Sequence, residues 1–124
     1  MKEHDLTQRA LYFDFYGALL TEKQRDIFDL HYQQDLSFGE ISEIRGVSRE
    51  AVYDLLKRTE AALKFYESKL KLVKKYQLSR EIIKEIAQKI EVLRKRVEND
   101  PRDRQMNEEL GQAADLLQKL DDSW

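Results

Sequence analysis

The chain has 124 residues, no cysteine and a formal net charge of −2, with 41% hydrophobic and 37% charged residues. This length suits one small domain with an appendage, and the absence of cysteine excludes disulfides and thiolate metal sites. No apolar run approaches the roughly 18 residues of a membrane-spanning helix. Residues 1–12 also lack the apolar stretch of a signal peptide, so we expect a cytoplasmic protein.

The first predicted helix is amphipathic and ends near Leu20. Its apolar residues recur at three- and four-residue steps: Leu11, Phe15, Ala18 and Leu19. A capping box formed by Thr21 and Gln24 then predicts the start of a second helix. The apolar face of this second helix is made of Ile27, Phe28 and Tyr32, with Leu30 at its margin.

Ser37 and Glu40 form another capping box, which predicts a short third helix with Ile41 and Ile44 at helical spacing. Gly46 ends this helix, because glycine tolerates the left-handed conformation common after a helix end. We expect Val47 to point inward between the two helices and Ser48 to cap the next one. The buried stripe of that fourth helix is predicted to be Val52, Leu55, Leu56, Thr59 and Leu63. Two capped helices around a glycine turn predict a helix-turn-helix over residues 21–60.

The sequence shows no break after Leu63, so the fourth helix is predicted to run to about Gln77. Ser79 is expected to cap a fifth helix over residues 80–98, and Asn99, Asp100 and Pro101 to separate it from a short final helix. The fifth helix carries an apolar stripe with heptad character: Ile82, Ile86, Ile90, Leu93 and Val97. We expect this stripe to pack within the chain or to form a homodimer.

The candidate ligand-binding residues lie on the fourth helix, whose first turn is the part that a recognition helix inserts into the major groove. They are Ser48, Arg49, Glu50, Tyr53, Asp54, Lys57 and Arg58. Arg49 can pair with guanine and Glu50 with cytosine, while Lys57 and Arg58 can meet phosphates. Residues 49–75 hold eight basic and four acidic side chains, which is a basic patch or simply a solvated helix face. An acid at Asp54 repels phosphate unless it accepts a hydrogen bond from a base.

The string LTEKQRDIFDLHY at residues 20–32 resembles region 4 of bacterial sigma factors. The likeness departs at Tyr53 and Asp54, where sigma factors carry basic or amide side chains. The strings FDFYGALLT (13–21), VSREAVYD (47–54) and KRTE (57–60) together resemble the YlxM family, in which Tyr53 and Asp54 belong to the family pattern. This resemblance implies a dimeric helix-turn-helix protein that is an accessory factor of the signal recognition particle and binds its GTPase, its RNA or both.

We therefore predict an all-α, wingless, sigma region 4-like helix-turn-helix domain at residues 1–76. A helical extension at residues 77–124 brings the total to about six helices. The sequence has no glycine-rich phosphate loop and no metal-binding motif, so we expect no enzyme activity, no cofactor and no metal. A DNA-binding transcriptional regulator and a plain protein-interaction module remain as alternatives to the accessory role.

Overall fold

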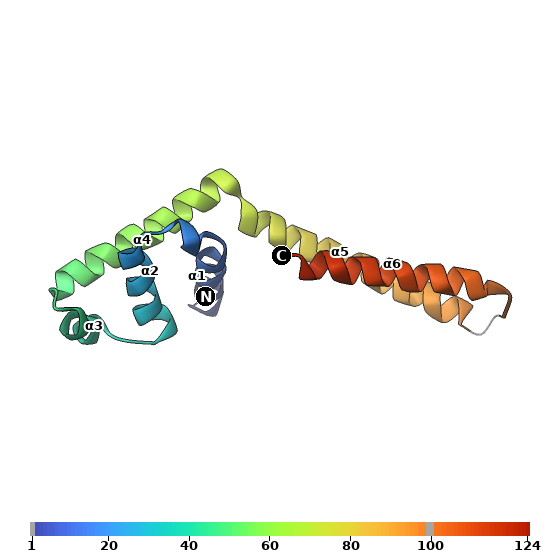
Figure 1. The fold of residues 1–124 in the computed structure, drawn as a ribbon, viewed down its shortest axis with the longest axis horizontal. Coiled ribbons are helices and arrows are strands. Elements are labelled where there is room, and N and C mark those ends of the chain that lie inside the picture. The colour runs from blue at the N-terminus through green and yellow to red at the C-terminus, as the bar shows by residue number, and fades with distance from the viewer. Residues whose placement is uncertain (1, 99–100) are drawn as a thin grey trace. The chain divides into compact units, whose positions relative to one another are not determined.

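The computed structural model describes the backbone of residues 2–98 and 101–124 and the side chains of residues 6–98 and 102–124. In these residues it has six α-helices and no strand (Figure 1), which confirms the predicted all-α class. The chain divides into two compact units, Met1–Val73 and Lys74–Trp124. The first unit contains α1 (Lys2–Tyr16), α2 (Glu22–Phe28), α3 (Phe38–Arg45) and α4 (Arg49–Leu70).

Side-chain hydroxyls cap the starts of α2, α3 and α4, as the sequence predicts. Thr21 and Ser37 each accept from a backbone amide three residues later, and Gln24 and Glu40 complete the two capping boxes. Ser48 Oγ accepts from the amide of Ala51 at 3.1 Å. Each cap satisfies an amide that has no partner within its helix, so the three helix starts are fixed by local sequence.

The core of the first unit consists of two apolar clusters that α4 joins. One cluster contains the buried residues Tyr16, Leu20, Phe28, Leu63 and Val73. The other contains Ile27, Leu30, Ile41, Val52 and Leu56. Between them the fully buried Thr59 donates its hydroxyl to the carbonyl of Leu55 at 2.8 Å. The predicted buried face of α4 is therefore confirmed.

The buried faces of α1 and α2 differ from those predicted. The α-helix α1 ends at Tyr16, and a 3-10 turn, η1 (Gly17–Leu19), rotates the following residues so that Leu20 is buried while Leu19 is 53% exposed. After α2 the chain widens into a π-helical turn, η2 (Asp29–Gln33). Because a π-turn holds more residues than an α-turn, the register shifts and Leu30 points into the core instead of lying at the margin.

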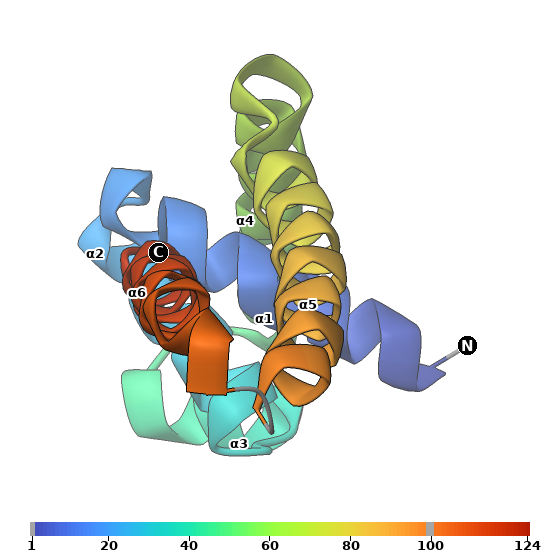
Figure 2. The ribbon, with the colours of Figure 1, turned by 90° about the vertical axis from the view of Figure 1, so that its right-hand side faces the viewer.

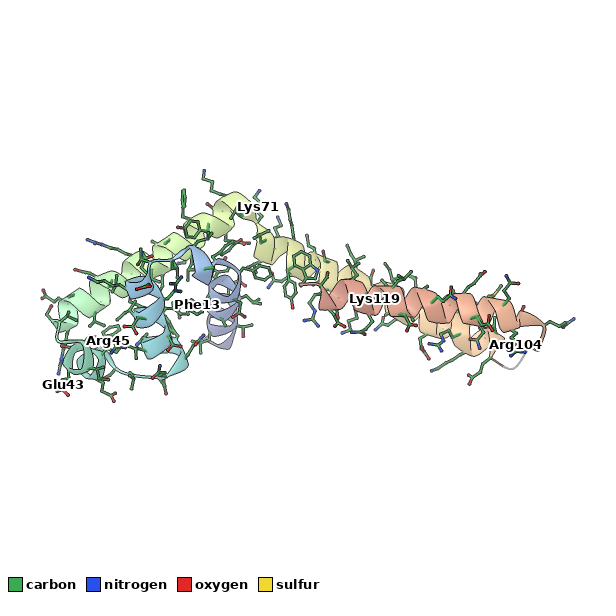
Figure 3. The ribbon with its side chains drawn as sticks, viewed as in Figure 1. Phe13, Glu43, Arg45, Lys71, Arg104 and Lys119 are labelled. Carbon is green, nitrogen blue, oxygen red and sulfur yellow. The ribbon has the colours of Figure 1, made fainter. Side chains whose placement is uncertain are left out.

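The junction of α4 and α5 (Leu72–Val97) lies at Lys71, labelled in Figure 3, and not at the predicted Ser79. Lys71 adopts the left-handed conformation with φ 54°. The buried Tyr16 hydroxyl donates to Glu67 and accepts from the amide of Leu72 at 3.0 Å. Glu67 also accepts from the amide of Val73 at 3.0 Å. Two side chains thus cap the first amides of α5, whereas Ser79 lies inside that helix.

The second unit is a helical hairpin in which α5 and α6 (Arg104–Asp122) run side by side, as Figures 1 and 2 both show. Arg80 Nε lies 3.8 Å from an Asp121 oxygen, and the rings of Tyr76 and Trp124 have centroids 5.4 Å apart. A 3-10 turn, η3 (Pro101–Asp103), precedes α6, while the break predicted at residues 99–100 lies outside the described residues. The final helix has 19 residues and is longer than the short helix expected.

Only one edge of the predicted apolar stripe of α5 is buried. Ile90 is buried and Val97 is half-buried, whereas Ile82, Ile86 and Leu93 are 56%, 41% and 44% exposed. Ile83, which was not assigned to the stripe, is buried. The described residues therefore leave an unpaired apolar strip on α5, and its part in a homodimer stays a prediction.

Candidate nucleic-acid interface

The turn between α3 and α4 is held by backbone geometry and by Ser42. Gly46 has φ 69° and its amide donates to the carbonyl of Ser42 at 2.9 Å. The amide of Val47 donates to the same carbonyl at 3.2 Å, and the Ser42 hydroxyl donates to the carbonyl of Val47. The helix-turn-helix predicted around Gly46 is thus present, with the left-handed glycine as its pivot.

Val47 does not fill the crossing of the two helices, so that prediction is wrong. Both backbone polar groups of Val47 face Ser42, which leaves its side chain directed outward and 46% exposed. Ile44 is likewise 54% exposed. The crossing is filled instead by Ile41 and Val52, which are fully buried.

An ion pair between Asp26 and Arg45 joins the C-terminal end of α3 to α2. Arg45 donates two hydrogen bonds of 2.7 Å to the Asp26 carboxylate. These bonds stabilise the charged carboxylate and hold the pKa of Asp26 below its ordinary value. Figure 3 shows Arg45 and Glu43 on this helix. The pair orients α3, and through it the turn that leads into α4.

The predicted ligand-binding residues lie on the first three turns of α4 or at its cap. All seven are exposed: Ser48, Arg49, Glu50, Tyr53, Asp54, Lys57 and Arg58. Positions 50, 53, 54 and 57 follow the three- and four-residue steps of one helix face. Along this face a carboxylate, an aromatic ring, a second carboxylate and an ammonium group therefore follow one another.

Arg49 reaches back across the turn to the start of α3. A Cβ atom placed on Gly39 would lie 3.1–3.3 Å from three atoms of the Arg49 guanidinium group. A side chain at position 39 would therefore make the guanidinium group shift by a few tenths of an ångström, whereas glycine accommodates it as it lies. Helical periodicity could not predict this contact, because Gly39 lies ten residues before Arg49 in another helix.

A row of aromatic rings extends from α4 across α3 to the end of η2. The centroids of Tyr53 and Phe38 are 5.8 Å apart, those of Phe38 and His31 4.9 Å, and those of His31 and Tyr32 4.7 Å. Lys57 Nζ lies 5.3 Å from the centre of the Tyr53 ring. Tyr32, predicted on the apolar face of the second helix, and Phe38 are both half-buried at the edge of the core.

Arg9 and Glu60 both contact Tyr32, the last ring of this row. Arg9 lies over the Tyr32 ring at 5.0 Å and 3.5 Å from a Glu60 oxygen. The Tyr32 hydroxyl donates to Glu60, and burial together with this hydrogen bond raises the pKa of Tyr32 to about 12. His31 Nδ1 donates to the carbonyl of Leu36 at 2.9 Å, which orients its ring.

Two adjoining hollows follow the row of rings. A hollow of about 310 Å³ is bounded by Phe38, Arg49, Glu50, Tyr53 and Asp54. A second, of about 130 Å³, is lined by residues that include Arg9, His31, Tyr32 and Lys57. Phe38 and Tyr53 border both hollows, so the two hollows lie next to each other beside α4, and we refer to them together as the groove.

Metal sites and membrane-spanning helices are absent from the described ranges. No group of three or more metal-ligating side chains occurs there. None of the helices in the same ranges has the length and hydropathy needed to cross a bilayer.

Comparison with known proteins agrees with this geometry. The profile of the YlxM/p13-like helix-turn-helix proteins (UPF0122) matches residues 2–104. A UPF0122 protein of Thermoanaerobacter sp. (strain X514) is 45% identical over 115 residues, which cover 93% of this chain and 97% of the relative. A UPF0122 protein of Bacillus thuringiensis (strain Al Hakam) is 43% identical over 115 residues, covering 93% and 96%.

A third relative, from Caldanaerobacter subterraneus subsp. tengcongensis, is 60% identical over 75 residues, covering 60% of this chain and 64% of its own. The profile match spans both the helix-turn-helix and the whole of α5. On these findings the chain belongs to the YlxM/p13-like family of helix-turn-helix proteins.

Proposed function

We propose that this protein is a regulatory, nucleic-acid-binding accessory factor of the signal recognition particle, and that α4 binds the RNA of the particle. The observation that carries the proposal is the exposed surface of α4, where Lys57 lies over the ring of Tyr53 and Arg49 borders the same hollow as that ring. Arg58 is exposed on the next turn. Cations bind the phosphate backbone and rings stack on bases. The link to this particle comes from the family resemblance.

RNA is favoured over promoter DNA because Glu50 and Asp54 share the face with these cations. In a duplex major groove a carboxylate lies close to phosphates and has few base donors to accept from. Unpaired RNA bases present additional donors and can be splayed away from the backbone. The exposed ring of Tyr53, which Phe38 meets edge-on, offers a stacking surface that the paired bases of duplex DNA cannot use.

A side-by-side titration tests this function with the purified particle RNA, the particle GTPase and random duplex DNA. If Arg49, Lys57, Arg58 and Lys64 all meet phosphates, the slope of log affinity against log salt is about −3 for single-stranded RNA. Lys57→Ala weakens binding, whereas Lys119→Ala, on α6, serves as the control. Binding to the GTPase alone, or a flat salt response, contradicts RNA binding through α4.

We also propose that the protein is a homodimer formed through the exposed strip of α5. Ile82, Ile86 and Leu93 place large apolar side chains in water on one long helix, and burying them against a second copy removes that surface from solvent. Ile82→Asp is expected to convert a dimer to a monomer in sedimentation at micromolar concentration. Ile44→Asp is the matched control, because that isoleucine is 54% exposed but lies in α3. A wild-type species of monomer mass at this concentration contradicts the proposal.

A further inference from the structure

The exposed face of α4 carries two carboxylates among its cations. Glu50 and Asp54 are exposed, and they border the same hollow as Arg49 and the two rings of Phe38 and Tyr53. A surface that bound only the phosphate backbone would gain nothing from two negative charges at its centre. Their position beside aromatic rings is instead what recognition of a nucleobase requires.

We propose that this hollow binds one unpaired guanine of a single-stranded RNA, with the carboxylates of Glu50 and Asp54 reading its Watson–Crick edge. The inference rests on the proposed function, since it names the feature of the RNA that α4 would recognise. The base stacks against the ring of Tyr53, and Arg49 and Lys57 meet the neighbouring phosphates.

The choice of guanine follows from the arrangement of donors on the bases. Guanine presents N1–H and N2–H side by side, and a carboxylate has two oxygens that can accept both. Adenine, cytosine and uracil each place an acceptor next to their Watson–Crick donor, which a carboxylate repels. In a duplex the N1–H and N2–H of guanine are already paired, so the hollow selects an unpaired base.

The surroundings of the hollow suit a stacked base. Tyr53 is 45% exposed and is met edge-on by Phe38, whose own position is fixed by the ring of His31 at 4.9 Å. Base stacking on an exposed aromatic ring stabilises single-stranded complexes. The hollow of about 310 Å³ opens directly onto Tyr53 and the two carboxylates.

The adjoining hollow gives the strand a path away from this position. It is lined by Lys57, by the rings of His31 and Tyr32, and by Arg9, which lies over Tyr32. A nucleotide next to the guanine would therefore meet both a ring and a cation. We infer that the strand follows the groove from the start of α4 toward α1.

Fluorescence anisotropy with short uridine-rich RNA strands tests the inference on the full chain. The strands carry a single guanine, inosine or 7-deazaguanine at the same position. Inosine lacks the N2 amine, whereas 7-deazaguanine keeps N1–H and N2–H but loses N7. We expect guanine and 7-deazaguanine to bind equally and inosine at least about fivefold more weakly, the lower end of what a bidentate base contact contributes.

The double substitution of Glu50→Gln with Asp54→Asn is expected to reduce the guanine-to-inosine ratio to about one. Removing two negative charges should also tighten binding of the inosine strand. The matched control is Asp35→Asn with Glu43→Gln, which removes the same two charges from exposed positions outside α4. In this control the ratio stays at its wild-type value.

Three results overturn the inference, and they separate it from the proposed function. Equal affinity for the guanine and inosine strands removes guanine recognition but leaves RNA binding by α4 intact. A loss of affinity with 7-deazaguanine assigns the contact to N7, and hence to Arg49 rather than to the carboxylates. Failure to bind any single strand, or the particle RNA, removes both proposals together.

Discussion

Replacing Tyr16 with phenylalanine removes one oxygen atom that connects α1 to the junction of α4 and α5. The hydroxyl of the fully buried Tyr16 donates to Glu67 and accepts from the amide of Leu72. Both bonds span more than fifty residues of sequence, with separations of 51 and 56. The variant leaves the ring in place, so packing is kept and only the hydrogen bonds are lost.

The expected cost follows from the charge of Glu67 and the burial of the hydroxyl. A hydrogen bond to a charged group contributes about 1.5–3 kcal/mol, and a neutral one about 1 kcal/mol. Because Glu67 still accepts from the amide of Val73, part of the network survives, and we expect a loss of about 2–3 kcal/mol. For a domain of this size that corresponds to a fall in Tm of roughly 10–20 °C.

Urea denaturation followed by circular dichroism measures this change. Tyr66→Phe is the matched control, because its hydroxyl is at the surface and donates to the carbonyl of Leu19 over 3.4 Å. The control should lose less than about 0.5 kcal/mol. If Tyr16→Phe costs no more than Tyr66→Phe, the hydrogen bonds of Tyr16 do not hold the junction.

The same variant should also change how the free energy of unfolding falls at alkaline pH. Burial, reinforced by the hydrogen bond with Glu67, raises the pKa of Tyr16 above its ordinary 10.0. A raised pKa means that the contribution of the neutral hydroxyl is complete below pH 10 and is lost as the pH rises through the folded pKa. Tyr16→Phe should therefore lose stability less steeply above pH 10 than the wild type, which a urea series at rising pH would measure.

Substitutions at three further positions test the helix-turn-helix. Gly46→Ala should cost about 1–2 kcal/mol in urea unfolding from its left-handed φ alone, since a Cβ there would meet no atom within 4 Å. Ser48→Ala should cost about 1 kcal/mol by removing the cap of α4, and Ser48→Asp, which restores an acceptor, should recover most of it. Arg45→Met should raise the pKa of Asp26 toward 3.8. The stability that the pair contributes is present above pH 3.8 and is lost as the pH falls through the lower folded pKa, so acid titration should show a smaller loss in the variant.

Features that depend on a few adjacent residues could be predicted from the sequence. The caps at Thr21, Ser37 and Ser48 and the stop at Gly46 each depend on contacts within five residues. The exposed face of α4 could be predicted for a related reason, because helical periodicity alone assigns its sides. All seven candidate residues are exposed on α4 or at its cap, while their part in binding stays a prediction.

Features that depend on distant contacts could not be predicted. Nothing near Lys71 marks a helix end, because the groups that cap α5 there include Tyr16 from the other end of the unit. The burial of Leu30 needs the π-turn, which has no simple sequence signature. Arg9 and His31 reach the groove only after α1 and η2 have packed beside α4, so helical periodicity could not assign them to it.

The hydrogen bonds that Tyr16 and Glu67 make beside Lys71 also determine where the chain can be cut into fragments. Val73 is fully buried with Tyr16 and Leu63, although it belongs to α5. A fragment that ended at the visible helix break would lose this side chain and both amides that Tyr16 and Glu67 cap. An autonomous helix-turn-helix fragment must therefore carry the first turn of α5, and limited proteolysis of the intact chain should spare the bond after Leu70 even though a helix ends there.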